Sequence, residues 1–182
     1  MKLLALNGSP RPFGNTWTLL ASALKAAQAN GAQVEQVDLA KLKIAPCQAC
    51  DSCRRTLRCR IADDMMLLYD KILDADVILI GTPVYFWSMS AQTKACVDRW
   101  YALDLDPLRT RMQGKRLGLI SCYADATTET ASGVVFAFRS AAEYLGWQFY
   151  EPVLVTAGAH GEAGRNPQAL QAAAQLGRRL IE

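Results

Sequence analysis

The sequence predicts an α/β fold, with a doubly wound, five-stranded parallel sheet in a single domain covering residues 1–182. Three observations predict it. Short apolar runs alternate with longer helical segments along the whole chain. The runs at 77–80 and 116–120 are almost continuously apolar, as expected of strands that are covered on both faces. No repeat, linker or low-complexity stretch divides the chain, and its length suits one well-buried core.

The expected strands and helices follow one another in regular order. Strands are expected at 2–6, 33–37, 77–80, 116–120 and 147–155, and helices at 16–30, 65–75, 91–103, 130–145 and 167–180. Asp63 and Asp64 are expected to begin the second helix, and Gly146 to end the fourth. Right-handed crossovers favour the strand order 2-1-3-4-5, in which the first and third strands meet at the switch point of the sheet. A cysteine-rich loop at about 45–62 interrupts the pattern.

Composition and charge narrow the class of protein. Of the residues, 51% are hydrophobic and 20% charged, which is ordinary for a globular domain. The net charge of +3 gives no case for a nucleic-acid partner, and no apolar run is long enough to cross a membrane. The apolar run near the N-terminus is too short for the core of a signal peptide, so the cytoplasm is the expected compartment. Six cysteines in that compartment are expected as ligands, redox groups or core residues instead of disulfides.

The segment from Gly8 to Thr16 joins the first strand to the first helix. Free backbone N–H groups and the helix dipole make such a junction an anion site. Ser9, Asn15 and Thr16 add hydrogen-bond donors, and Arg11 adds a positive charge. The chain has neither G-x-G-x-x-G nor G-x-x-x-x-G-K-[ST] at this place, so the monophosphate of flavin mononucleotide (FMN) is the expected anion. A simple turn with a helix cap is the alternative.

Two further segments follow strands at the same edge of the expected sheet. Residues 81–90 contain the consecutive aromatics Tyr85, Phe86 and Trp87, which suit the stacking of a flat flavin ring. The alternative is that these aromatics cover the core or an oligomer interface. The loop that begins at Ser121 is expected to close over the other edge of the ring.

The cysteine-rich loop has the spacing C-x2-C-x2-C-x5-C. Its four thiols, Cys47, Cys50, Cys53 and Cys59, lie within thirteen residues. A [4Fe–4S] cluster, a zinc ion and an empty set of reduced thiols are the three alternatives. Four arginines of the same loop are expected to favour the thiolate form and to attract anions: Arg54, Arg55, Arg58 and Arg60.

Together these motifs resemble the flavodoxin-like NAD(P)H-dependent FMN reductases. The resemblance rests on Gly8-Ser9-Pro10-Arg11, Gly14-Asn15-Thr16, Thr82 to Phe86, and Lys94 with Asp98-Arg99. The cysteine spacing followed by Asp63-Asp64-Met65 resembles the iron–sulfur flavoprotein branch. The resemblance implies a flavodoxin-like sheet, with FMN held at its phosphate by Ser9, Arg11, Asn15 and Thr16, and at its ribityl chain and ring by Pro83, Val84, Tyr85 and Phe86. Lys94, Asp98 and Arg99 are expected as paired charges on a helix surface.

The function that the resemblance implies is an FMN-dependent oxidoreductase. It would pass electrons between NAD(P)H or another donor and a small acceptor such as a quinone, a flavin or an iron–sulfur centre. No catalytic side chain is expected, because the cofactor carries the electrons. The alternatives are a non-enzymatic electron carrier and a redox-sensing binding module that uses the cysteine loop. Trp87, Trp100 and Tyr101 are expected to leave an aromatic patch exposed, so a homodimer or homotetramer is expected.

Overall fold

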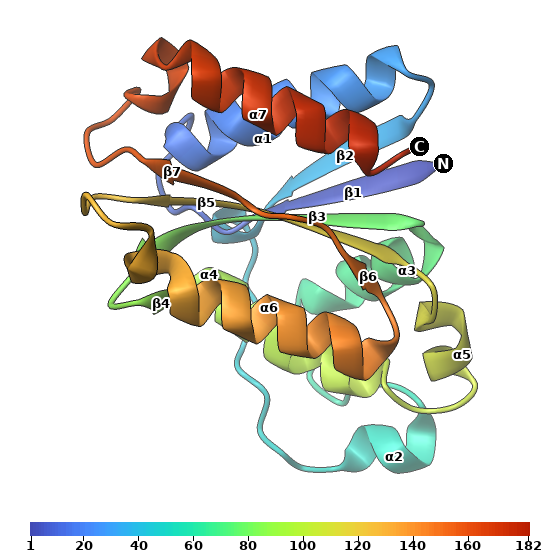
Figure 1. Cartoon of the computed structure of the whole chain (residues 1–182). Coiled ribbons are helices and arrows are strands. Elements are labelled where there is room, and N and C mark those ends of the chain that lie inside the picture. Colours follow the sequence, from blue (N-terminus) through green and yellow to red (C-terminus); the bar gives the residue numbers. More distant parts are fainter.

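The computed structural model describes residues 1–182 as one twisted sheet between two layers of helices (Figure 1). The parallel strands are β1 (Lys2–Asn7), β2 (Gln33–Asp38), β3 (Val77–Tyr85), β5 (Arg116–Tyr123), β6 (Gln148–Phe149) and β7 (Val153–Thr156). They lie in the order β2-β1-β3-β5, and β6 and β7 both pair with β5. The short β4 (Ser88–Met89) pairs antiparallel with the end of β3. The predicted order 2-1-3-4-5 is confirmed, because β6 and β7 together occupy the fifth place.

The predicted fifth strand, 147–155, is interrupted in its middle. Residues Tyr150 to Pro152 join β6 to β7 without belonging to either strand. Pro152 has no backbone N–H to donate to a neighbouring strand, so a continuous ladder is not available there. The chain therefore pairs with β5 in two short pieces.

The two helical layers bury opposite faces of the sheet. Helices α1 (Asn15–Ala29) and α7 (Pro167–Arg179) cover one face, and α3 (Met65–Asp74), α4 (Ala91–Asp98) and α6 (Ser132–Leu145) cover the other (Figure 1). Side chains alternate along a strand, so β1 sends Leu3 and Ala5 into one core and Leu4 and Leu6 into the other. The helices α1 and α7 approach so closely that a Cβ at Gly177 would lie 2.1 Å from the carbonyl oxygen of Ala23.

Shorter helical pieces complete the fold. They are α2 (Ser52–Thr56), α5 (Leu108–Met112) and the 3-10 turns Leu39–Lys41, Arg99–Ala102, Thr128–Ala131 and Ala163–Arg165. The helix predicted at 91–103 is α at its start and 3-10 at its end, and the one predicted at 130–145 begins with a 3-10 turn. The cysteine loop carries α2 and lies on the α3–α4–α6 side of the molecule, far from the sheet (Figure 1). Every helix is too short or too polar to span a membrane.

Candidate functional site

A small cavity opens at the carboxyl edge of the sheet, where β1, β3, β5 and β7 end. Its volume is about 150 Å³, and its walls come from Ser9, Arg11, Asn15, Thr16, Pro83, Tyr85, Cys122, Tyr123, Ala124, Ala157 and Gly158. This is the switch point between β1 and β3, the place where open α/β sheets bind ligands. Six of these eleven residues are among the nine that the sequence predicted for a flavin.

The N-terminus of α1 presents free hydrogen-bond donors to this cavity. The helix begins after Gly14, which offers no side chain as a cap. The backbone N–H groups of Asn15, Thr16 and Trp17 donate to no acceptor within the protein. Ser9 accepts a bond from the Arg11 N–H through its hydroxyl oxygen, at 3.3 Å, which curls the loop around the helix end. Unpaired N–H groups at a helix start favour an anion there.

Asn15 lines the cavity, but its side chain serves a different purpose from the one predicted. The amide nitrogen donates to the carbonyl oxygens of Ala157 and Ala159, at 3.0 and 2.8 Å. The amide oxygen accepts a bond from the Ala163 N–H at 3.1 Å. The side chain therefore fastens the first loop to the segment after β7, and only the backbone N–H of Asn15 faces an anion.

Thr16 and Cys122 form the inner wall. Both side chains are buried, and the Thr16 hydroxyl lies within hydrogen-bond reach of the Cys122 thiol. Burial raises the pKa of Cys122 to about 11, although the Thr16 hydroxyl opposes this change. Cys122 is therefore an uncharged thiol at neutral pH and does not repel an anion in the cavity.

The segment predicted as a loop at 81–90 is a β-hairpin. Strand β3 continues through Tyr85, and β4 returns beside it. Because strand side chains alternate, Pro83 and Tyr85 line the cavity while Val84 packs toward the core on the other side. Phe86, at the tip, is 94% exposed and does not touch the cavity, and its neighbour Trp87 is 62% exposed.

Ser121 is buried behind the cavity wall. Its hydroxyl donates to the carbonyl oxygen of Thr82 at 2.8 Å and so joins β5 to β3. The next residue on β5, Cys122, takes the place at the wall that was predicted for Ser121. Tyr123 and Ala124 belong to the segment after Ser121 that was expected to lie over the ring, although neither was singled out. Ala157 and Gly158 were not predicted, and their only signal was their position just after β7.

Three buried hydroxyls tie the first loop to the hairpin. Ser90 donates to the carbonyl oxygen of Gly8 at 2.6 Å, and its oxygen lies 2.9 Å from that of Thr93. Thr93 in turn bonds the Thr82 hydroxyl at 3.1 Å. A Cβ at Gly8 would lie 1.8 Å from the Thr93 hydroxyl, so only glycine allows this close approach. The network fixes the anion-binding loop relative to Tyr85.

The four cysteines of the second candidate site surround one narrow space. Cys47, Cys50, Cys53 and Cys59 all line a cavity of about 20 Å³. No group of three or more Cys, His, Asp or Glu side chains is arranged to hold a metal ion. Cys47 and Cys50 are exposed, whereas Cys53 is buried and Cys59 half-buried. The donor set suits a thiolate-bound cluster, but a space of this size holds about one water molecule and is too small for the cluster.

The backbone of the cysteine loop is strained. Ala49, Asp51 and Leu57 have positive φ angles of 49°, 52° and 55°, which L-residues rarely adopt. Burial raises the pKa of the Cys53 thiol, and the neighbouring Cys59 and Cys50 raise it further. The expectation that the loop arginines favour the thiolate is therefore not met at Cys53.

The charges expected on one helix surface have different environments. Lys94 and Asp98 form an exposed ion pair on α4, as predicted. Arg99 is only 1% exposed and pairs with Asp63 at 2.8 Å, so its assignment to the surface is wrong. Trp100 is also buried and packs against Trp147 in the core, so it contributes nothing to an exposed aromatic patch.

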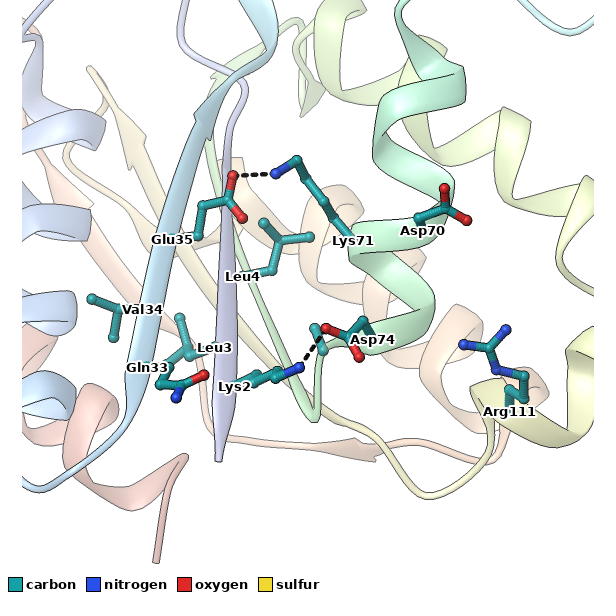
Figure 2. A pocket seen from close by; sticks show the side chains of 11 residues that line it. Lys2, Leu3, Leu4, Gln33, Val34, Glu35, Asp70, Lys71, Asp74 and Arg111 are labelled. Carbon is teal, nitrogen blue, oxygen red and sulfur yellow. Dashed lines mark hydrogen bonds and ion pairs between the residues drawn. The ribbon is translucent and has the colours of Figure 1, made fainter.

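A larger cavity, of about 640 Å³, lies at the opposite edge of the sheet (Figure 2). It is formed by the first residues of β1 and β2 and by α3. Lys2 pairs with Asp74 and Lys71 with Glu35, both at 2.6 Å, and all four side chains are largely exposed. Solvated pairs of this kind are worth little, and the amino edge of a parallel sheet is not where ligands of this fold bind. The small cavity at the carboxyl edge remains the candidate site.

Comparison with known proteins agrees with this geometry. Over 115 residues the chain is 41% identical to an iron–sulfur flavoprotein of Methanocaldococcus jannaschii, a match that spans 63% of this chain and 60% of that protein. It is 29% identical over 180 residues to a Bacillus subtilis protein named as an NAD(P)H-dependent FMN-containing oxidoreductase, spanning 97% and 96% of the two chains. Its matches to the iron–sulfur flavoproteins span about half to three-fifths of their length.

The fold also has solved relatives. An NAD(P)H:quinone oxidoreductase from Methanothermobacter marburgensis superposes with a TM-score of 0.72 at 17% identity, covering 100% of this chain and 98% of that one. The sequence profile described as NADPH-dependent FMN reductase matches residues 1–161. The chain therefore belongs to the NADPH-dependent FMN reductase family, as its motifs predicted.

Proposed function

We propose that this chain is an oxidoreductase that binds FMN at the carboxyl edge of its sheet and transfers electrons from NAD(P)H to a small acceptor. A quinone, a flavin or an iron–sulfur centre would serve as the acceptor. The observation that carries the proposal is the set of unpaired N–H groups at the start of α1, beside Arg11 and opposite Tyr85. Oxidation of both NADH and NADPH, with and without added quinone or FMN, tests the activity and separates an enzyme from an electron carrier.

Different residues of the cavity would bind different parts of FMN. The N-terminus of α1, Arg11 and Ser9 supply donors and charge for the phosphate, and Thr16 supplies a buried hydroxyl. Tyr85 offers a half-exposed aromatic surface for the ring. Bound FMN supplies the electron-transfer chemistry, and the protein supplies position and shields one side of the site from water. The enclosed volume is below the 300–1,000 Å³ of ordinary ligand pockets, so much of the flavin would lie outside it.

Substitution of the phosphate-binding residues tests this assignment. Arg11→Ala and Thr16→Val each remove a hydrogen bond to a charged group, worth about 1.5–3 kcal/mol. We expect the Kd for FMN to rise by roughly 10- to 150-fold, measured by flavin fluorescence titration. Lys25→Ala, at the other end of α1, makes the same charge change away from the cavity and controls for it. Wild-type affinity in both site variants would contradict the placement of the phosphate.

We further propose that Cys47, Cys50, Cys53 and Cys59 ligate one [4Fe–4S] cluster. The support is a donor set made only of thiols that converge on one space, together with the names of the iron–sulfur flavoproteins that the chain matches. Zinc is less well supported, because the relatives that the chain matches are named as iron–sulfur flavoproteins. The exposed half of the loop, with Cys47 and Cys50, would move outward to make room.

Iron and sulfide content after anaerobic reconstitution tests the cluster. We expect close to four irons per wild-type chain and almost none in the Cys50→Ser/Cys53→Ser variant. The Cys96→Ser variant removes a buried thiol of α4, outside the cysteine loop, and is the matched control. No iron in the wild-type chain, or equal iron in the double variant, would reject the cluster and leave the flavin proposal standing.

The partial enclosure of the flavin site supports a homodimer or homotetramer. Phe86 and Trp87 are exposed beside the cavity, and a second copy would cover both them and the open side of the site. Light scattering that gives a monomer mass at working concentrations would contradict this. Six free cysteines fit a reducing compartment, so we propose the cytoplasm.

A further inference from the structure

The guanidinium of Arg99 is the most deeply buried charge in the molecule. It lies in the 3-10 turn after α4 and is 1% exposed. Burying an ionised group is costly unless all of its donors find partners. Arg99 meets this requirement with groups at the two ends of the cysteine loop and with Tyr69 on α3.

The partners of Arg99 come from both ends of the cysteine loop. Nη1 donates to the carbonyl oxygen of Ala45 at 2.9 Å, and Nη2 to that of Ile61 at 3.3 Å. Both nitrogens also reach the Asp63 carboxylate, at 2.8 and 3.1 Å, and Nε lies 3.3 Å from the hydroxyl oxygen of Tyr69. Asp63 then accepts a bond from the Ala45 N–H at 2.8 Å. The residues just before Cys47 and just after Cys59 are thus held by one side chain.

We propose that Arg99 is the positioning residue that closes the cysteine loop before any metal binds, and so brings the four thiols together. The guanidinium is planar and rigid, which lets it hold two carbonyl oxygens and a carboxylate at once. A simple core ion pair between Arg99 and Asp63 would not need the two carbonyls from opposite ends of the loop. The value of this closure for metal binding rests on the cluster proposed above. The closure itself is a property of the metal-free chain.

Hydrogen exchange of the metal-free protein tests the closure. Arg99→Lys keeps the positive charge but removes the planar guanidinium with its two terminal nitrogens. We expect the protected amides of residues 46–60 to exchange at least tenfold faster in this variant. Arg99→Met should have a larger effect. The matched control is Lys115→Met, which removes another buried cation that bonds two backbone carbonyls, those of Leu73 and Ala75, and none of the cysteine loop. FMN affinity within twofold of wild type identifies the variants that have kept the fold.

The possible results distinguish closure of the loop by Arg99 from binding of a cluster by the four thiols. Faster exchange confined to 46–60 in Arg99→Lys, together with lower iron content after reconstitution, supports both. Faster exchange in a chain that binds no iron supports the closure and rejects the cluster. Unchanged exchange at 46–60 in Arg99→Lys overturns the closure whatever the iron content. Equal loosening of the loop in Lys115→Met overturns it as well, because the effect would then be a general loss of stability.

Discussion

At the residue scale, Asp63 is the carboxylate that pairs with the buried Arg99 beside the cysteine loop. Its carboxylate accepts bonds from both Arg99 terminal nitrogens and from the N–H groups of Ala45 and Met65. Burial raises the pKa of this carboxyl group, but the hydrogen bonds and the charge of Arg99 outweigh burial and lower the pKa overall. Asp63 was predicted only as a helix cap, and it also holds the loop.

The lowered pKa of Asp63 makes its contribution to stability dependent on pH. A depressed pKa in the folded state stabilises the protein above the unfolded-state pKa, about 3.9, and the effect is lost as pH falls through the folded pKa. We expect Asp63→Asn to reduce the free energy of unfolding by about 1.5–3 kcal/mol at pH 7 and by progressively less below pH 4. Urea unfolding at a series of pH values measures this difference.

Asp70→Asn is the matched control for that series. Asp70 is exposed on α3 and forms no ion pair, so its substitution should leave stability nearly unchanged across the range. A loss of stability in Asp63→Asn that stays constant down to acidic pH would contradict the ionised role of this carboxylate.

The residues of the cavity at the carboxyl edge and of the cysteine loop were predictable to different degrees. Ser9, Arg11 and Thr16 were predicted from the chemistry of a strand–helix junction, which depends on local sequence alone. The side-chain partners of Asn15 and the burial of Arg99 were not predicted, because the groups that these two side chains bond are distant in sequence. The acceptors of Asn15 lie after β7, and those of Arg99 lie on both sides of the cysteine loop. No local pattern contains that information.

The hairpin of β3 and β4 is the element in which local preference and structure disagree most. Phe86 and Trp87 form its turn with φ angles of 47° and 57°. Two-residue turns of this kind favour Asn-Gly, because bulky residues at positive φ are strained. The sequence predicted that the strand ends at residue 80 and that residues 81–90 form a loop, yet β3 extends through Tyr85 to the turn. The exposed aromatics are thus retained in spite of their backbone cost, which suits a role in binding.

Relief of this strain is testable. We expect Phe86→Asn/Trp87→Gly to raise the free energy of unfolding by about 1 kcal/mol, because both new residues accept positive φ. Phe86→Ala/Trp87→Ala removes the same aromatics without relieving the strain and serves as the control. Urea denaturation of the apoproteins measures the effect. Equal stability of the two double variants would contradict the strain.

The strands and helices lie closer to their predicted positions than the β3–β4 hairpin does. Four of the five predicted strands and all five helices lie where apolar periodicity placed them, within a few residues at most ends. The exceptions have physical causes. Pro152 divides the last strand, and the helix after Ala91 tightens to 3-10 at Arg99, where the guanidinium turns inward to the cysteine loop.

At the scale of the whole molecule, one segment holds both candidate sites. Residues 90–102 begin with Ser90, which bonds the Gly8 carbonyl of the anion-binding loop. They end with Arg99 and with Tyr101, whose hydroxyl bonds Asp51 at 3.0 Å inside the cysteine loop. The sequence predicted a flavin site and a cysteine site that exchange electrons, but the short helical segment that joins them is visible only in the folded chain. The distance between a flavin and a cluster would therefore be set by α4 and the turn that follows it.

The hydrogen bonds of the Asn15 side chain to the segment after β7 affect the order in which the pocket forms during synthesis on the ribosome. The first strand and helix emerge early, but the three backbone groups that hold the Asn15 side chain belong to residues 157–163, which are synthesised much later. Until then the part of α1 that packs against α7 is also uncovered, because α7 has not yet appeared. A growing chain therefore displays the loop from Gly8 to Thr16 for most of its synthesis without a completed pocket around it, and we expect any ligand of this pocket to be enclosed only after residues 157–163 are in place.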